Sequence, residues 1–255
     1  TFSFAHFYSR RVRRLFPALI FVCTLSLVAA AYILTPHDLK RFGSEVTATI
    51  FAISNFYFLS ETGYFDTSAA MKPLIHTWSL SVEEQFYLFW PALVFLLVTK
   101  FKKKVILRSL FVVSGVTLAA SIIFKYYSPE AVFFITPFRF YEFAIGASIV
   151  WLKGLKSETL FGVGLALIML PMIFFDDLPI LPCLGAALII YANNPKRLGK
   201  ILTNKVMVGL GLISYSLYLV HWPIIVFYKY SVFEPIDFVA ASAIFSASLL
   251  MAALM

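Results

Sequence analysis

Long apolar stretches separated by short polar loops constrain this chain more than any other feature. Most of them approach the roughly 20 residues that a helix needs to cross the hydrocarbon core of a bilayer, and only the stretch at 180–192 is clearly shorter. Hydrophobic residues make up 61% of the 255 residues and charged residues 13%, whereas a soluble domain has about 25% charged residues. The pattern predicts an all-α fold, a polytopic transmembrane helix bundle of about eight spans that forms a single domain over residues 1–255. The predicted spans are 15–35, 77–99, 104–125, 134–152, 159–175, 180–192, 207–229 and 237–255.

The net charge of +8 is explained by membrane topology rather than by a nucleic-acid partner, because the basic residues lie between the apolar stretches. A ninth apolar stretch at about 44–60 contains Glu45, Ser54 and Asn55. If it does not cross, one side of the membrane receives most of the 21 basic residues, as the positive-inside rule requires. We therefore predict that 36–76 lies outside, that 44–60 is a surface-lying or re-entrant segment, and that both chain ends are cytoplasmic.

Polar residues at the start of the second span form the first candidate site. On a helix, His76, Ser79 and Glu83 share one face, and about 10 Å along the axis separates the histidine from the carboxylate. An ionisable residue within a span is costly and points to function. A histidine and a carboxylate on one face could form a base with its partner, or bind a substrate hydroxyl. The alternative is a helix start at the membrane interface, with Trp78 as a residue of the aromatic belt.

Two further polar groups lie in the later spans. Arg139 and Glu142 have the i,i+3 spacing of an ion pair, which is either structural or part of a site, and Gly146 after them is expected to permit close helix packing. In the segment from 214 to 223, Ser214, Tyr218 and His221 share a face. The histidine is either a satisfied core residue or a site residue of the outer half of its span.

Four arginines precede the first span, namely Arg10, Arg11, Arg13 and Arg14. A basic cluster at a cytoplasmic helix end is what orientation requires, but arginine forks also suit phosphate oxygens. On the predicted topology these arginines lie inside, whereas the histidines, Glu83, Arg139 and Glu142 lie in the outer half. This asymmetry suggests a phosphate-bearing donor inside and an acceptor outside. The two cysteines, Cys23 and Cys183, are interpreted as small buried residues, and neither a metal site nor a bound cofactor is predicted.

These segments together resemble the acyltransferase-3 family of membrane acyltransferases. The resemblance rests on FYSRRVRRLFPAL at 7–19, GYFD at 63–66, KPLIHTWSLSVEEQFY at 72–87, the Arg139 and Glu142 segment, and SYSLYLVHWP at 214–223. The long motif at 72–87 is specific, and the others occur in the expected order. The paired-arginine motif of the family maps onto either Arg10 and Arg13 or Arg11 and Arg14.

The resemblance implies acyl-CoA, usually acetyl-CoA, as co-substrate, and a sugar hydroxyl of lipopolysaccharide O-antigen, peptidoglycan or exopolysaccharide as acceptor. It implies an inner-membrane, multi-pass enzyme of about ten spans, of which this chain lacks the first two. In some family members the chain also continues into a C-terminal extracytoplasmic domain. Those missing spans would carry the family's arginine and histidine, the histidine being the usual catalytic candidate. Within this chain the catalytic candidates are Glu83, His76 and His221. Trp78, Ser79, Tyr218, Arg139 and Glu142 are expected on the acceptor side or in structural roles.

Two other classes of function remain open at this stage. A transporter or flippase for a lipid-linked or sugar substrate would also carry intramembrane charges, although no inverted repeat is evident in the sequence. A sensory protein could keep the fold without the activity. The sequence leaves the acceptor sugar, the acyl chain and the oligomeric state undetermined.

Overall fold

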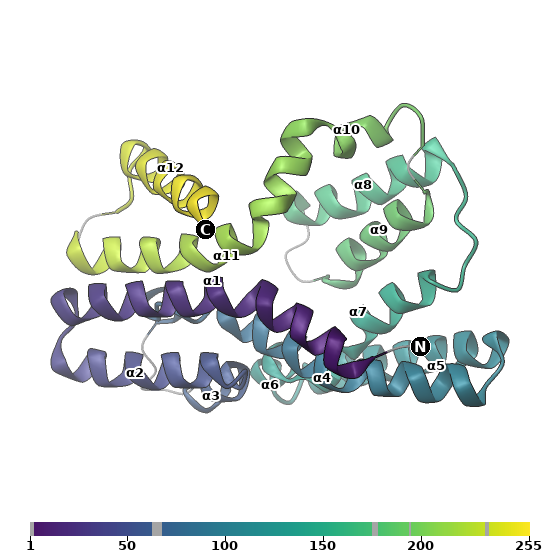
Figure 1. Ribbon diagram of the computed structural model, residues 1–255, viewed down its shortest axis with the longest axis horizontal. Coiled ribbons are helices and arrows are strands. Elements are labelled where there is room, and N and C mark those ends of the chain that lie inside the picture. Colours follow the sequence, from purple (N-terminus) through teal and green to yellow (C-terminus); the bar gives the residue numbers. More distant parts are fainter. Residues whose placement is uncertain (1–2, 63–67, 175–177, 194, 233–234) are drawn as a thin grey trace. The chain divides into compact units, whose positions relative to one another are not determined.

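The computed structural model describes residues 3–62, 68–174, 178–193, 195–232 and 235–255, and all regular structure within these ranges is helical (Figure 1). The predicted motif at 63–66 lies outside the described residues. Contacts divide the chain into two compact units, residues 1–91 with 210–255, and residues 92–209. The helices are α1 Phe4–Ile33, α2 Pro36–Ile50, α3 Ser54–Ser60, η1 Ala69–Met71, α4 Thr77–Lys100, α5 Lys103–Phe124, α6 Pro129–Phe134, α7 Thr136–Ile149, α8 Glu158–Phe174, α9 Ile180–Tyr191, α10 Gly199–Thr203, α11 Lys205–Ser231 and α12 Phe238–Leu254.

Four of the helices, α1, α4, α5 and α11, are long and apolar enough to cross a membrane. Helices α8 and α12 have 17 residues each, α7 has 14 and α9 has 12, so each is shorter than the roughly 20 residues of a typical span. The prediction of an all-helical protein with membrane-spanning helices is therefore confirmed. The predicted count of about eight spans is not confirmed.

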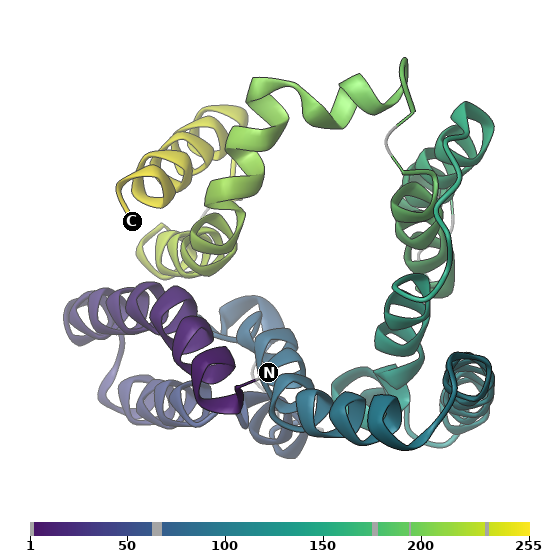
Figure 2. The same cartoon turned by 45° about the vertical axis from the view of Figure 1, so that its right-hand side comes forward.

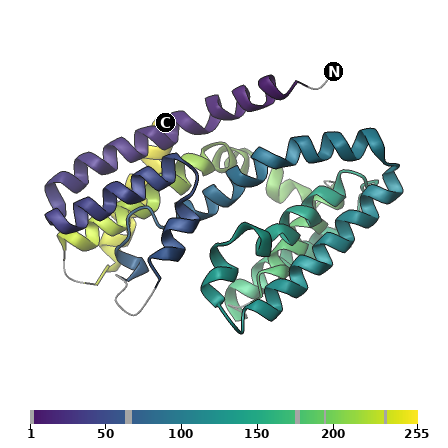
Figure 3. The same ribbon diagram turned by 90° about the horizontal axis from the view of Figure 1, so that it is seen from below.

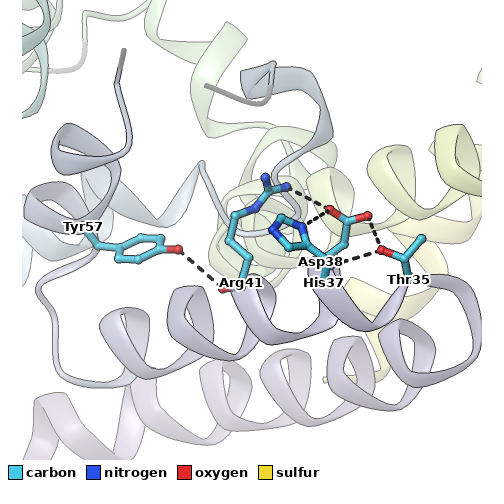
Figure 4. Close-up of polar contacts among 5 residues, drawn as sticks. All are labelled: Thr35, His37, Asp38, Arg41 and Tyr57. Atoms are coloured by element: carbon cyan, nitrogen blue, oxygen red, sulfur yellow. Dashed lines mark hydrogen bonds and ion pairs between the residues drawn. The ribbon is translucent and has the colours of Figure 1, made fainter. Parts of the chain in front are cut away.

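In the first unit, α1 and α2 form an antiparallel hairpin (Figures 1 and 3). The turn is short because Thr35 caps α2 at once: its hydroxyl accepts the Asp38 N–H at 3.2 Å and donates to the Asp38 carboxylate at 2.8 Å, a reciprocal cap. Asp38 also pairs with Arg41 one turn later at 3.6 Å, and the Tyr57 hydroxyl approaches the Arg41 carbonyl (Figure 4).

The segment expected to be surface-lying or re-entrant consists of α2 and α3 joined by a sharp bend. At the bend Ala52 has a φ of 54°, in the left-handed region. Neither helix is among those long enough to cross a membrane, which agrees with a segment that does not cross. Its polar residues Glu45, Ser54 and Asn55 are buried within the first unit.

Replacing Ala52 with glycine should raise the thermal unfolding temperature. An L-residue in the left-handed region destabilises the folded state by about 1–2 kcal/mol, and glycine removes this strain. Glycine also makes the unfolded chain more flexible, which costs roughly 0.5–1 kcal/mol, so a small net increase in stability is expected. Differential scanning fluorimetry of the detergent-solubilised protein measures it. Ala48→Gly, in the regular part of α2 and buried, should lower the same temperature. An Ala52→Gly protein that melts earlier than wild type would show that the bend is not strained.

A ladder of buried hydroxyls fastens the bend to the start of α4. Thr49 contacts Thr77 at 2.9 Å, Thr77 contacts Ser54 at 3.1 Å, and Ser54 contacts Ser81 at 2.7 Å, oxygen to oxygen. All four side chains are buried. A buried hydroxyl without a partner costs about 1–3 kcal/mol, so each rung stabilises this register of α2 and α3 on α4.

At the other end of the chain, α11 and α12 lie side by side (Figure 2). Helix α11 continues through Pro223, which is buried, as far as Ser231.

In the second unit, glycines allow α8 and α9 to cross closely. A Cβ added at Gly164 would lie 2.8 Å from the Gly185 carbonyl oxygen, and one at Gly185 would lie 2.6 Å from that of Gly164. The two backbones therefore touch where only glycine fits. The expectation that Gly146 permits close packing is wrong for the part of the chain that the structure describes, because a Cβ there would have no atom within 4 Å.

Candidate active site

The helix that contains the four N-terminal arginines sets one of them apart from the others. Helix α1 begins at Phe4, ahead of the predicted membrane span at 15–35, with Ser3 as its N-cap. Arg10, Arg13 and Arg14 have the i, i+3, i+4 spacing of one helix face. Arg11 is half-buried, whereas Arg10, Arg13 and Arg14 are exposed.

Arg11 lies against α4. Its guanidinium carbon is 2.9 Å from the centroid of the Tyr87 ring, a cation–π contact. Beside it, the Tyr8 hydroxyl donates to the Leu88 carbonyl at 2.7 Å. These residues line a crevice of 80 Å³ between α1 and α4, together with Glu84. Within the described residues, Arg11 Nε and Glu84 Oε1 are buried without a hydrogen-bond partner, and buried polar atoms are seldom left so.

Glu83 lies with this arginine and not with the histidines. It is exposed on α4 and interacts electrostatically with Arg11 and, one turn on, with Tyr87. The predicted separation of inner arginines from an outer Glu83 is therefore not what the structure shows. The reason is that α1 begins early enough to include Arg11. Arg11 therefore lies beside the turn of α4 that contains the two carboxylates. We call Tyr8, Arg11, Glu83, Glu84 and Tyr87 the arginine centre.

A second polar centre lies where α4 begins and α11 passes. The His76 ring is 5.6 Å from the His221 ring and 5.2 Å from the Tyr218 ring, centroid to centroid. The Tyr218 hydroxyl donates to the His76 carbonyl, which can only accept. Its oxygen therefore accepts from Ser79, 2.6 Å away. We call His76, Ser79, Tyr218 and His221 the histidine centre.

His76 is the buried member of this centre. Burial, reinforced by neighbouring His221 and opposed by the Leu219 backbone, lowers the pKa of His76 to about 3, so this imidazole is neutral at physiological pH. Within the described residues neither of its ring nitrogens has a well-formed hydrogen bond. The ring packs against the rings of Tyr218 and His221. Trp78, two residues later, is half-buried in the first turn of α4.

His221 is the accessible member. Its Nδ1 lies 2.8 Å from the Tyr218 carbonyl oxygen, and because a carbonyl only accepts, the bond places the proton on Nδ1. Nε2 then carries the lone pair. The ring borders a groove of 570 Å³ between α11 and α12, whose other lining residues are Ser214, Leu217, Tyr218, Ile225, Ile236, Ala241, Ile244, Phe245 and Ser248. The groove is thus apolar, with an imidazole and hydroxyls at one place in its wall.

The predicted ion pair of Arg139 and Glu142 is confirmed. Arg139 donates through Nε at 3.0 Å and through Nη2 at 2.8 Å to the same carboxylate oxygen. Both side chains are 25% exposed. The pair lies on α7 in the second unit, whereas the arginine and histidine centres belong to the first. On α9, Cys183 is half-buried rather than buried and contacts the Glu142 carbonyl.

Sequence reasoning missed Glu45 and Lys72 as members of the first unit's polar interior, where both are 1% exposed. A signal was present, because Phe42, Glu45, Val46 and Thr49 follow the i, i+3, i+4, i+7 spacing of one helix face and all four are buried. That spacing places Glu45 on the inner face of α2.

Comparison with known proteins gives the class of protein first. The family model described as an acyltransferase domain matches residues 1–255. The chain belongs to the acyltransferase-3 family, as its motifs indicated.

Several curated relatives are similar to the chain. It is 30% identical over 246 residues to the O-acetyltransferase OatA of Staphylococcus aureus (strain NCTC 8325 / PS 47). This alignment covers 87% of this chain and 41% of the relative. It is 28% identical to the peptidoglycan O-acetyltransferase OatA of Listeria monocytogenes serovar 1/2a, covering 86% of this chain and 39% of the relative. An uncharacterised protein of Haemophilus influenzae is 28% identical, and the alignment covers 78% of this chain and 90% of the relative. The chain thus spans about two fifths of the OatA relatives, and no solved structure matches it.

Proposed function

We propose that this chain is the membrane domain of an O-acetyltransferase that moves an acetyl group from cytoplasmic acyl-CoA to a hydroxyl of a cell-surface glycan. The observation that carries the proposal is the histidine centre, where an imidazole with a free Nε2 borders an apolar groove large enough for an acyl group and part of its acceptor. The names of the OatA relatives support acetyl as the acyl group, and the name of the Listeria relative supports peptidoglycan as the acceptor.

Of the three catalytic candidates in this chain, the geometry favours His221. His76 is buried against the other rings, and Glu83 lies in the arginine centre. In the proposed reaction, His221 Nε2 takes the proton of the sugar hydroxyl as its oxygen attacks the thioester carbonyl. The carbon–sulfur bond then breaks, and the thiolate of CoA takes the proton from the imidazolium. Protons and charges balance without a further reactant.

The arginine centre is proposed as the donor side. Arg11 has a buried Nε without a partner among the described residues, above a crevice that is open to a ligand. A guanidinium is suited to phosphate oxygens, and the exposed Arg10, Arg13 and Arg14 add positive charge around it. A cytoplasmic donor requires the N-terminal end, which carries the arginine centre, to face the cytoplasm. We propose the same side for the other end of this chain, in an inner membrane.

The first test is transfer itself. Membranes that contain the full-length protein are supplied with acetyl-CoA labelled in the acetyl group and with soluble peptidoglycan fragments, and ester-linked label is measured in the fragments. We expect label that is released by mild base. Uptake of the sugar substrate into vesicles without any ester formation would contradict the proposal and favour a transporter.

Arg11→Ala is expected to raise the KM for acetyl-CoA about ten- to a hundredfold, because a hydrogen bond to a charged group contributes about 1.5–3 kcal/mol. The kcat should change much less. Arg108→Ala, an exposed arginine of α5 in the second unit, is the matched control and should leave the KM unchanged. An Arg11→Ala protein with the wild-type KM would remove Arg11 from the donor site.

A further inference from the structure

Three hydrogen bonds from two other helices hold the turn that carries His76. The Trp222 indole donates to the Lys72 carbonyl at 2.9 Å, and the Tyr218 hydroxyl donates to the His76 carbonyl; both donors come from α11. From α2, a carboxylate oxygen of Glu45 accepts the Leu74 N–H at 3.1 Å. The middle of the turn is thus fixed by one side chain from a helix outside the histidine centre.

Glu45 is an unexpected residue for this position. It is 1% exposed and lies on the inner face of α2, and burying a carboxylate is costly unless a specific contact offsets it. The charged and titratable groups that act on it are Arg41 of α2, Lys72 of the turn and Glu61 at the end of α3, while Tyr230 of α11 also interacts with it. Among the described residues its hydrogen bond is to the Leu74 N–H of the turn, so the contact that offsets its burial is the contact to the turn.

We propose that Glu45 is a positioning residue for the acetyl transfer: by holding the Leu74 N–H it fixes the His76 turn, and through the His76 ring it fixes the orientation of His221. The inference rests on the proposed function. The path is short, because His76 follows Leu74 by two residues and its ring contacts the rings of both Tyr218 and His221. A shift of about 1 Å in a reacting group can cost up to a hundredfold in rate.

Glu45 has a titration that makes this role measurable. Burial raises the pKa of Glu45 from 4.5 to about 7, although the Leu74 N–H, Arg41 and Lys72 all lower it. The ionised carboxylate is the stronger acceptor, so its hold on the turn should tighten as pH rises through about 7. Stability has the opposite sign. A folded-state pKa above the unfolded value contributes stability below about 4.5, and this contribution is lost as pH rises to about 7.

Activity and stability should therefore move in opposite directions with pH, which a purely structural role would not produce. The experiment measures kcat and the thermal unfolding temperature of the purified full-length protein between about pH 5.5 and pH 8.5. For wild type we expect kcat to have an acid limb, a rise with pH centred near the Glu45 pKa of about 7, because Glu45 must be ionised. A kcat that does not rise with pH in this range would overturn the inference and requires no variant.

Glu45→Gln sharpens the test. Glutamine keeps an acceptor oxygen for the Leu74 N–H but never ionises. We expect kcat at about pH 8 to fall about tenfold, and the rise of kcat through the acid limb to become smaller. The KM for acetyl-CoA should stay the same, and the unfolding temperature at that pH should equal or exceed that of wild type. Glu130→Gln, an exposed glutamate of α6, is the matched control and should behave as wild type. A Glu45→Gln protein with the wild-type kcat and limb would overturn the positioning role, whereas a wild-type protein without any transfer would instead overturn the proposed function.

Discussion

Replacing His221 with glutamine is expected to lower the kcat of acetyl transfer about 10²- to 10⁴-fold, the range that a general base contributes. Glutamine has a similar size and can still hydrogen-bond to the Tyr218 carbonyl, as Nδ1 of His221 does, but it cannot take a proton. The KM for acetyl-CoA should hardly change, because Arg11 lies in the other centre. Initial rates with labelled acetyl-CoA in solubilised full-length protein measure both constants.

His37→Gln is the matched control for this variant. His37 lies in the first turn of α2 and its side chain is 87% exposed (Figure 4), so the same substitution there should leave the kcat unchanged. The unfolding temperature of each variant shows that the fold is kept. If His221→Gln transfers acetyl at the wild-type rate, the proton acceptor is not in the histidine centre.

Valine at position 185 should prevent the second unit from forming. The first added carbon would lie 2.6 Å from the Gly164 carbonyl oxygen and close to Ile168, and backbone cannot move aside as a flexible side chain can. Overpacking typically costs about 1–3 kcal/mol and at times more; we expect the upper end or beyond, because the clash is with main chain. Fluorescence-detected size-exclusion chromatography would show loss of the monodisperse peak.

Gly146→Val distinguishes a clash from a general intolerance of valine in these helices. Position 146 is exposed on α7 with no atom within 4 Å of an added Cβ. This control should elute and melt as wild type does. Equal behaviour of the two variants, whether both fold or both fail, would contradict the close crossing of α8 and α9.

The helical fold could be predicted because apolar stretches close to the length of a membrane span indicate helices that are surrounded by lipid. All eight predicted stretches correspond to helices, and the ambiguous 44–60 region indeed forms short helices around a bend. The span count could not be predicted from apolar length alone. Stretches such as 134–152 and 180–192 fold into α7 and α9, which are shorter than the apolar runs that contain them.

The candidate site was predicted in its residues but not in its grouping. The contact among the predicted residues His76, Ser79, Tyr218 and His221 is present. These residues could be recognised because each of the two segments has a histidine near a hydroxyl, which is visible in the local sequence. The pairing of Arg11 with the α4 carboxylates depends on where α1 begins, which hydropathy cannot locate when four arginines interrupt it. Glu45 contacts Leu74 across 29 positions of sequence, and a single sequence read alone contains no signal for such a long-range pair.

The hydroxyl ladder between the bend and α4 has a consequence for chimaeras within the family. Apolar contacts tolerate exchange of one side chain for another of similar volume, but the rungs from Thr49 to Ser81 are directional and pair one atom with one atom. Residues 36–60 are therefore not a self-contained cassette. A transplant of this segment into a relative would have to bring the first turns of α4 with it, so the smallest exchangeable module runs from α2 to at least residue 81.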